Sequence, residues 1–271
     1  MACAAIVRNA FGVALFAAAA ALWQPPVAHA AEPATGSADA VGTSWHQKTA
    51  VIVEPSVELW TGSEAYRHVS ALYAGATWSP FTNLRQDGLR LRVVGGQSDY
   101  RYAGTRYDPG TDAYIWENFR GRARFVDILA GWQFSAGTTT VKAFGGFGLT
   151  AHQITPSDPS TQVQGTAQGL KGALEIWHNW TPLLWSSLDL SLARAHMSYA
   201  AQLRTGWRFG NGWSAGPEVS VAGHSETEIR RAGLFIRNET PADEWVVSGG
   251  VSRGRGDSPS AYATGQYLRR F

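Results

Sequence analysis

The chain has 271 residues and carries 23 Lys and Arg side chains against 21 Asp and Glu, so its formal net charge at pH 7 is only +2. Without a basic excess, a nucleic-acid partner is not expected. Beyond residue 22, no apolar run approaches the roughly 20 residues that a membrane-spanning helix needs, so a helical membrane protein is not expected either.

The N-terminal segment has the features of a secretory signal peptide. Arg8 supplies a positive start, residues 10–22 are small or apolar, and an Ala-x-Ala cleavage site ends at Ala30. The single cysteine, Cys3, lies in this leader, and a mature chain without thiols suits the oxidising periplasm. Residues 31–50 are small and polar and are predicted to form a flexible periplasmic lead-in.

From residue 51 onward, apolar and polar residues alternate. In residues 187–192, for example, three leucines alternate with Ser187, Asp189 and Ser191. Side chains of a strand point alternately to its two faces, so each such segment has one apolar and one polar face. The pattern predicts an all-β chain that forms an antiparallel up-and-down transmembrane β-barrel of about twelve strands. The expected strands lie near residues 52–62, 69–79, 87–102, 121–134, 138–153, 165–179, 184–196, 198–209, 213–224, 228–238, 244–253 and 260–271. The predicted organisation is a signal peptide over residues 1–30, the lead-in over 31–50 and the barrel over 51–271.

The connections between these strands differ at the two ends of the predicted barrel. Short links are expected at 135–137, 180–183, 210–212 and 239–243, and longer ones at 103–120, 154–164 and 254–259. Bacterial barrels have short periplasmic turns and longer outer loops, and an even strand number places both termini in the periplasm. The sequence therefore predicts a bacterial outer-membrane location, with outer-membrane lipid as a partner.

Along the predicted strands, charged residues gather at the alternate positions, on the face opposite the apolar one. A Lys or Arg that faces lipid at mid-depth costs roughly 2–4 kcal/mol, so this parity is assigned to the lumen. Acids and bases in similar numbers can pair across the lumen, and we expect it to be narrow or partly plugged, with residues 31–50 or 103–120 as candidate plugs. The predicted lumen ionic cluster consists of Glu58, Arg90, Arg92, Lys171, Glu175, Asp189, Arg204 and Glu218. These side chains could form a constriction that selects solutes by charge or a structural ladder of salt bridges, and we favour the ladder.

Four aromatic residues share the luminal parity: Trp60, Tyr73, Phe144 and Trp177. Aromatic faces stack on sugar rings, so these residues are candidates for contact with a glucan. The alternative is that the rings pack a plug or lie on this parity because of a β-bulge, and we favour that alternative.

The C-terminal strand carries the signature residue of outer-membrane barrels. Phe271 is predicted to face lipid together with Tyr267 and Ala263, and to be recognised by the barrel-assembly machinery. Arg269 shares this face, but near the membrane edge its long side chain can extend to the headgroups.

His196 and Ser198 resemble the His-x-Ser arrangement of membrane-embedded lipid hydrolases, in which His activates a Ser hydroxyl. Such a site also needs a group that orients the His, and Gln202 is the nearest on the next strand, so a tight turn is favoured. The histidines lack the spacing of metal ligands, and we expect no metal and no cofactor.

Several short segments together resemble the BcsS family of bacterial cellulose-biosynthesis accessory proteins. These segments are Glu58-Leu59-Trp60-Thr61-Gly62, Trp78-Ser79-Pro80-Phe81, Asp87-Gly88-Leu89-Arg90-Leu91-Arg92, Ala173-Leu174-Glu175-Ile176-Trp177, Gly216-Pro217-Glu218 and Arg270-Phe271. The resemblance implies a non-enzymatic outer-membrane barrel that acts in cellulose biosynthesis, export or surface anchoring, with cellulose or export components of the synthase as partners. It implies no catalytic residues. A general solute porin and a lipid hydrolase that uses His196 and Ser198 are the alternatives.

Overall fold

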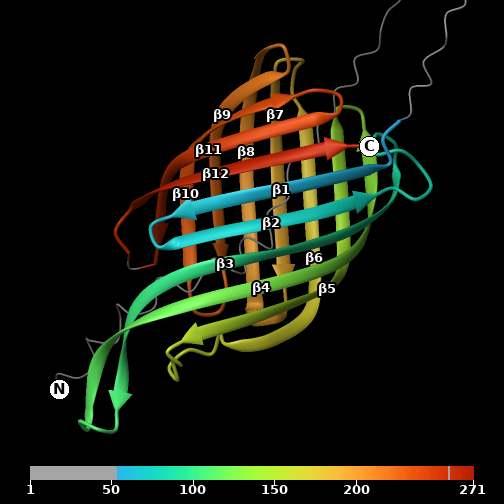
Figure 1. Ribbon diagram of the computed structural model, residues 1–271. Coiled ribbons are helices and arrows are strands. Elements are labelled where there is room, and N and C mark those ends of the chain that lie inside the picture. Colours follow the sequence, from blue (N-terminus) through green and yellow to red (C-terminus); the bar gives the residue numbers. More distant parts are fainter. Residues whose placement is uncertain (1–53, 256) are drawn as a thin grey trace, which may run out of the picture.

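The computed structural model describes residues 54–255 and 257–271, which form a closed antiparallel β-barrel of twelve strands (Figure 1). Each strand pairs with its neighbours in sequence, and β1 pairs with β12 to close the barrel. The predicted up-and-down barrel is therefore confirmed, whereas the predicted signal peptide and lead-in lie outside the described residues. The strands are β1 (Val57–Tyr66), β2 (Val69–Trp78), β3 (Gly88–Asp108), β4 (Ala113–Ala136), β5 (Thr139–Thr155), β6 (Gly165–Asn179), β7 (Leu184–Ala193), β8 (Ser198–Gly210), β9 (Trp213–Gly223), β10 (Glu228–Glu239), β11 (Asp243–Gly254) and β12 (Ser260–Arg270).

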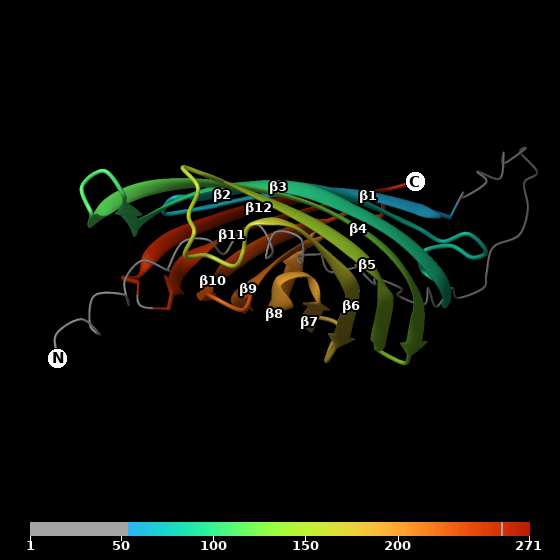
Figure 2. The same cartoon turned by 90° about the horizontal axis from the view of Figure 1, so that it is seen from below.

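The barrel is flattened, so that two walls face each other across a thin interior (Figure 2). Strands β1–β3 and β12 in one wall run at a steep angle to β7 and β8 in the other (Figure 1). The walls are in contact, because Ala200 of β8 packs against a cluster that includes Trp60 of β1 and Tyr73 of β2. The interior is therefore thin enough for side chains to fill it.

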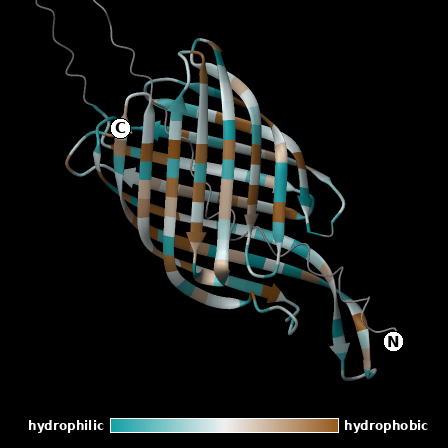
Figure 3. Ribbon diagram, turned by 180° about the vertical axis from the view of Figure 1, so that it is seen from behind, coloured by the Kyte–Doolittle hydropathy of each residue, from teal (hydrophilic) through white to brown (hydrophobic). Residues whose placement is uncertain are grey.

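Hydropathy alternates along the strands as the sequence predicts (Figure 3). Large apolar side chains that point outward include Leu72, Ile128 and Leu234, each 67% exposed. Several outward tryptophans, among them Trp78 and Trp213, lie close to strand ends on the side of the barrel that carries the C terminus. An apolar belt bordered by aromatic rings is the surface that a lipid bilayer requires of a barrel. Among residues 54–255 and 257–271, no helix is long and apolar enough to cross a membrane.

Tight turns join four of the five strand pairs at the end of the barrel that carries the C terminus, and the exception is the longer 79–87 connection between β2 and β3. The β8–β9 turn is Asn211-Gly212, and both residues have positive φ, 49° and 78°. A two-residue hairpin turn with two positive φ values favours Asn followed by Gly, because both tolerate the left-handed region. At the opposite end, the β7–β8 connection contains a 3₁₀ turn, η3 (Ala195–Met197).

The segment 103–120 differs from its prediction. It was expected to be a long loop and a candidate plug, but it is a hairpin whose strands stay in register from Ala103 and Asn118 to Asp108 and Ala113. This β3–β4 hairpin projects beyond the barrel at the end opposite the C terminus (Figure 1). The plug prediction for 103–120 is thus wrong, because aromatic residues with high strand propensity continue the alternation and only residues 109–112 form the turn.

Candidate functional site

All members of the predicted ionic cluster are buried, with exposed fractions of 6% or less. The structure does not bring all of them together. Arg90 lies at the end with the short turns, where its guanidinium donates to Ser79 Oγ at 2.8 Å and to the carbonyl oxygens of Asn83 and Gln86. Arg90 therefore holds the 79–87 connection rather than the centre of the lumen.

One set of ion pairs crosses the interior between strands that are not neighbours. Arg92 Nη1 of β3 lies 2.5 Å from Glu175 Oε1 of β6, and Lys171 of β6 pairs with Asp127 of β4. The Arg92 guanidinium also lies 3.9 Å from the centre of the Phe144 ring. These contacts connect β3 to β6 across the lumen, in addition to the hydrogen bonds of the wall.

A second set surrounds Glu218 of β9. Its carboxylate accepts from Arg204 Nε at 2.8 Å, from Ser248 Oγ at 2.9 Å and from Tyr262 Oη at 2.7 Å. The donors come from β8, β11 and β12, so one carboxylate joins four strands. Because the charge is both paired and hydrogen-bonded, its burial is compensated.

Sequence analysis missed further pairs of the same kind. Arg231 of β10 lies 3.0 Å from Glu64 of β1, and Glu244 of β11 accepts from Arg237 at 2.9 Å and Arg270 at 3.2 Å. The alternation in β10 could have revealed them. Leu234 and Ile236 mark the outward positions of this strand, so Arg231 and Arg237 fall on its luminal face.

Cavities of different sizes lie beside these pairs. One of about 380 Å³, at the end that carries the C terminus, is lined in part by Ser214, Arg237 and Arg270. A cavity of about 40 Å³ inside the barrel is lined by Glu64, Asp189, Gln202 and Arg231. One water molecule needs about 10–15 Å³ measured in this way, so the cavity holds only a few. The described part of the lumen thus contains several buried ion pairs that connect its strands.

The luminal aromatic residues predicted as glucan contacts fall into three separate places, and each is at most 6% exposed. The ring centres of Trp60 and Tyr73 are 6.0 Å apart, Phe144 lies under Arg92, and Trp177 stacks on Trp185 at 4.1 Å. Their faces are covered by other side chains of the barrel.

Glycines of the inner face make room for several of these rings. A Cβ atom at Gly62 would lie 2.0 Å from Tyr73 Oη, and one at Gly206 would lie 2.4 Å from the Trp185 ring. Because the ring of one strand covers the bare backbone of its neighbour, only glycine fits at these positions.

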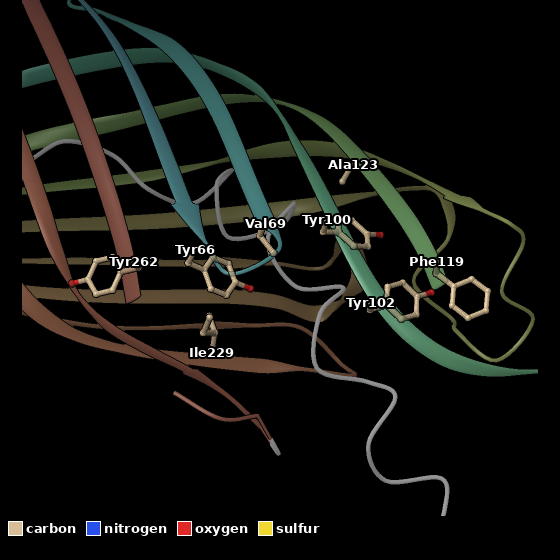
Figure 4. Close-up of a cluster of buried hydrophobic side chains, with 8 residues drawn as sticks. All are labelled: Tyr66, Val69, Tyr100, Tyr102, Phe119, Ala123, Ile229 and Tyr262. Atoms are coloured by element: carbon tan, nitrogen blue, oxygen red, sulfur yellow. The ribbon is translucent and has the colours of Figure 1, made fainter. Parts of the chain in front are cut away.

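Other aromatic rings gather on the β3–β4 side of the barrel. On the inner face, Tyr100, Tyr102 and Phe119 form a row, with ring centres 6.3 Å and 5.0 Å apart (Figure 4). These three rings are buried and belong to the cluster drawn in Figure 4.

On the outer face of the hairpin, Tyr107, Tyr114 and Trp116 are 46%, 76% and 66% exposed. We call these three residues the hairpin aromatic face. They share one side of two paired strands, because Tyr107 is in register with Tyr114 and Trp116 follows Tyr114 by two positions. Sequence analysis missed this face because it assigned 103–120 to a loop.

The two residues of the candidate hydrolase pair contact other groups. Ser198 Oγ donates to the Ala195 carbonyl at 3.1 Å, and the His196 ring lies against His152 with ring centres 5.0 Å apart. Ser198 therefore stabilises the η3 turn. Within residues 54–255 and 257–271, no group of three or more His, Cys, Asp or Glu side chains is arranged to hold a metal ion.

Phe271 faces outward and is 54% exposed. Its backbone closes the barrel, since its carbonyl accepts from Ser56 N at 2.7 Å and its N–H donates to Val57 O at 2.7 Å. The Arg269 guanidinium lies 5.5 Å from the Phe271 ring and 3.9 Å from Asp243 Oδ1. Arg269 is thus held at the edge of the belt, where a charge can reach the headgroups.

A closed barrel with an apolar belt outside and paired charges inside is the architecture of an outer-membrane β-barrel protein, and the chain is such a protein. Residues 58–271 match the family described as "Cellulose biosynthesis protein BcsS". The chain therefore belongs to the BcsS family and has a role in cellulose biosynthesis. The predicted family and the predicted outer-membrane location are confirmed.

Solved barrels resemble this chain at low sequence identity. The TodX deltaS2S3 mutant, a monoaromatic hydrocarbon channel, is 9% identical over 80% of this chain and 91% of its own, with a TM-score of 0.51. The KdgM porin is 9% identical over 79% and 99%, with a TM-score of 0.45. An outer membrane channel from Pseudomonas putida F1 is 11% identical over 80% and 96%, with a TM-score of 0.47. No curated protein sequence matches the chain. The similarity to TodX concerns the fold alone.

Proposed function

We propose that this barrel is a non-enzymatic anchor that holds cellulose at the cell surface through its hairpin aromatic face. The observation that carries the proposal is a contrast within one molecule. Buried ion pairs cross the described lumen, whereas three aromatic rings stand exposed on a hairpin that projects beyond it. A lumen crossed by buried ion pairs is unsuited to the passage of a polymer, and an exposed row of rings is suited to holding one.

The orientation of the barrel is part of the proposal. Four of the five connections at the end that carries the C terminus are tight turns, and the extended hairpin lies at the other end (Figure 1). Short turns belong on the periplasmic side of bacterial barrels, so the hairpin would project from the cell surface. Cellulose that has left the cell would meet it there.

The chemistry of the hairpin aromatic face fits a β-glucan. The rings of Tyr114 and Trp116 are two positions apart on one strand, a spacing of roughly 7 Å. Aromatic faces offer large apolar contact area, and the Tyr hydroxyl and Trp N–H groups add polar contacts at the ring edges. A flat chain of sugar rings could lie along such a row, with C–H groups on the aromatic faces and hydroxyls at their edges.

The luminal residues would then have a structural role. Trp60, Tyr73, Phe144 and Trp177 would fill the interior, and the ionic cluster would hold the two walls together. Contact with the glucan would fall to residues outside the lumen. In this proposal, the luminal residues stabilise the fold and the hairpin aromatic face binds the glucan.

Binding to cellulose tests the proposal. Full-length protein in detergent micelles is mixed with microcrystalline cellulose, and the bound fraction is measured over a range of protein concentrations. The triple variant Tyr107→Ala, Tyr114→Ala, Trp116→Ala should bind at least about tenfold more weakly, since stacked rings contribute about 0.5–1.5 kcal/mol each. The matched control is Trp60→Phe with Trp177→Phe, which changes the luminal rings and should leave binding unchanged.

Heat-dependent gel mobility shows that each variant is folded. Equal binding by the triple variant and the unchanged protein would contradict the anchor. Planar-bilayer conductance gives a second, independent outcome. Steady ion conductance that cello-oligosaccharides block would place the glucan in the lumen, and steady conductance that they do not block would favour a porin.

A further inference from the structure

The outward face of β3 and β4 changes character just beyond the apolar belt. Within the belt, outward side chains include Val93 on β3 and Ile128 on β4. Closer to the hairpin, three successive outward cross-strand pairs are polar or charged. They are Gln97 with Arg124, Asp99 with Arg122, and Arg101 with Arg120.

The first two pairs are satisfied by their own partners. Arg124 Nε donates to Gln97 Oε1 at 3.0 Å, and Arg122 Nε donates to Asp99 Oδ1 at 2.7 Å. Each pair therefore has a donor and an acceptor within reach, and the pair of Asp99 and Arg122 has no net charge.

The third pair places two guanidinium groups opposite each other. Like charges directly opposite on neighbouring strands are destabilising. Within residues 54–255 and 257–271, no carboxylate lies within 4 Å of Arg101 or Arg120, and both side chains are exposed. The two positive charges thus lack a counter-charge in the described part of the protein.

A concavity of about 720 Å³ opens beside this pair. The backbone N–H of Arg101 donates to the His68 carbonyl at 3.2 Å, which fixes the β1–β2 turn against β3 and forms one edge of the concavity. Basic groups dominate its lining, and Asp99 is its single acid. The lining comprises Arg67, His68, Asp99, Arg101, Arg120 and Arg122 together with neighbouring residues of β2 to β5.

We propose that Arg101 and Arg120 bind the phosphate of a phosphorylated lipid headgroup in the membrane leaflet next to the hairpin. Arg matches phosphate oxygens bidentately, and two guanidinium groups can share one dianionic phosphate. The site lies on the outer wall and is the third outward cross-strand pair beyond the belt, so a lipid whose chains lie along the belt presents its headgroup at this height. A phosphate there converts the repulsion between Arg101 and Arg120 into a shared attraction.

The barrel carries a second cross-strand pair of arginines that serves as a matched control. Arg230 of β10 lies opposite Arg253 of β11 near the same end of the barrel. There, Arg230 Nε donates to Glu228 Oε1 at 2.7 Å, so an acid of the protein already supplies the counter-charge. The two pairs carry the same charge, but only the pair of Arg230 and Arg253 has a carboxylate of the protein bound to one of its guanidinium groups.

The test measures lipid binding by full-length protein in neutral detergent. The probes are diphosphorylated lipid A, the same lipid after removal of both phosphates, and inorganic phosphate. The double variant Arg101→Gln, Arg120→Gln should lose at least tenfold in affinity for diphosphorylated lipid A, and Arg230→Gln, Arg253→Gln should change it less than twofold. The dephosphorylated lipid should bind both doubles and the unchanged protein equally weakly.

Three results would overturn the proposal. They are an unchanged affinity in the first double variant, an equal loss in both doubles, and an affinity for inorganic phosphate equal to that for the phosphorylated lipid. Heat-dependent gel mobility verifies that both doubles are folded, and removal of a repulsive pair gives no reason for the first to unfold. The result does not depend on cellulose, so this proposal and the glucan anchor succeed or fail separately.

Discussion

The interior of the barrel and the projecting β3–β4 hairpin use the same residue types in opposite surroundings. In the interior, Arg237 and Glu244 form two hydrogen bonds, and both side chains are at most 2% exposed. On the hairpin, Arg106 and Glu117 are 3.8 Å apart and 35% and 30% exposed. Loss of one partner from a buried pair leaves an uncompensated charge, whereas water replaces the partner on the surface. Identical chemistry thus stabilises the fold in one region and remains available to a ligand in the other.

Aromatic residues show the same difference. Trp177 and Trp185 stack face to face at 4.1 Å in the interior, whereas Tyr107 and Tyr114 meet edge to face at 5.7 Å on the hairpin and leave most of their faces free. Burial of the interior rings stabilises the fold, whereas the hairpin rings keep exposed contact area that a bound sugar can cover.

The largest expected difference between the two regions concerns ion pairs. Glu218→Ala should lower the free energy of unfolding by about 3–5 kcal/mol, because the buried charge of Arg204 would lose its carboxylate. Glu117→Ala on the hairpin should cost at most about 1 kcal/mol. Urea unfolding in lipid vesicles, followed by tryptophan fluorescence, measures both. Equal costs would show that the interior pairs are no more important than the surface one.

A glycine substitution should give an intermediate difference. Gly206→Val places methyl groups where the Trp185 ring lies and should cost about 1–3 kcal/mol through overpacking. Gly110→Val on the hairpin turn meets only the flexible Asp108 carboxylate, at 3.4 Å, and should change stability little. The same unfolding assay compares the variants, and a harmless Gly206→Val would mean that the ring is free to move aside.

The smallest expected effect is a pH response confined to the hairpin turn. The Thr111 hydroxyl, at 2.8 Å, and the Gly110 N–H, at 3.1 Å, hold the pKa of Asp108 below its ordinary value of 3.8. A lowered pKa in the folded state stabilises the turn above pH 3.8, and this contribution is lost as the pH falls through the folded-state pKa. The protection factor of the Gly110 amide in hydrogen exchange, which is the intrinsic rate at each pH divided by the observed rate, should therefore fall only below pH 3.8. A loss of protection that begins above this pH, or that persists in Asp108→Asn, would contradict the assignment.

Alternation predicted the strands and the orientation of their side chains, because parity is a local property of the chain. It assigned Glu175 and Arg92 to the lumen, but it did not identify them as partners, since contact between β3 and β6 depends on how the barrel flattens. The hairpin was missed for a different reason. Gly104, Pro109 and Gly110 indicate a loop, yet the pairing of Tyr107 with Tyr114 extends the ladder almost to the turn. The charge pairs in β10 were within reach of the parity rule.

The unbroken register of β3 and β4 has a mechanical consequence. A polymer attached near Trp116 and dragged by moving fluid would pull along the axes of both strands. The hydrogen bonds of β3 to β2 and of β4 to β5 run across that axis and would be loaded in shear, many at once. A tether built as a continuation of the wall would therefore resist tearing better than a flexible loop of equal length.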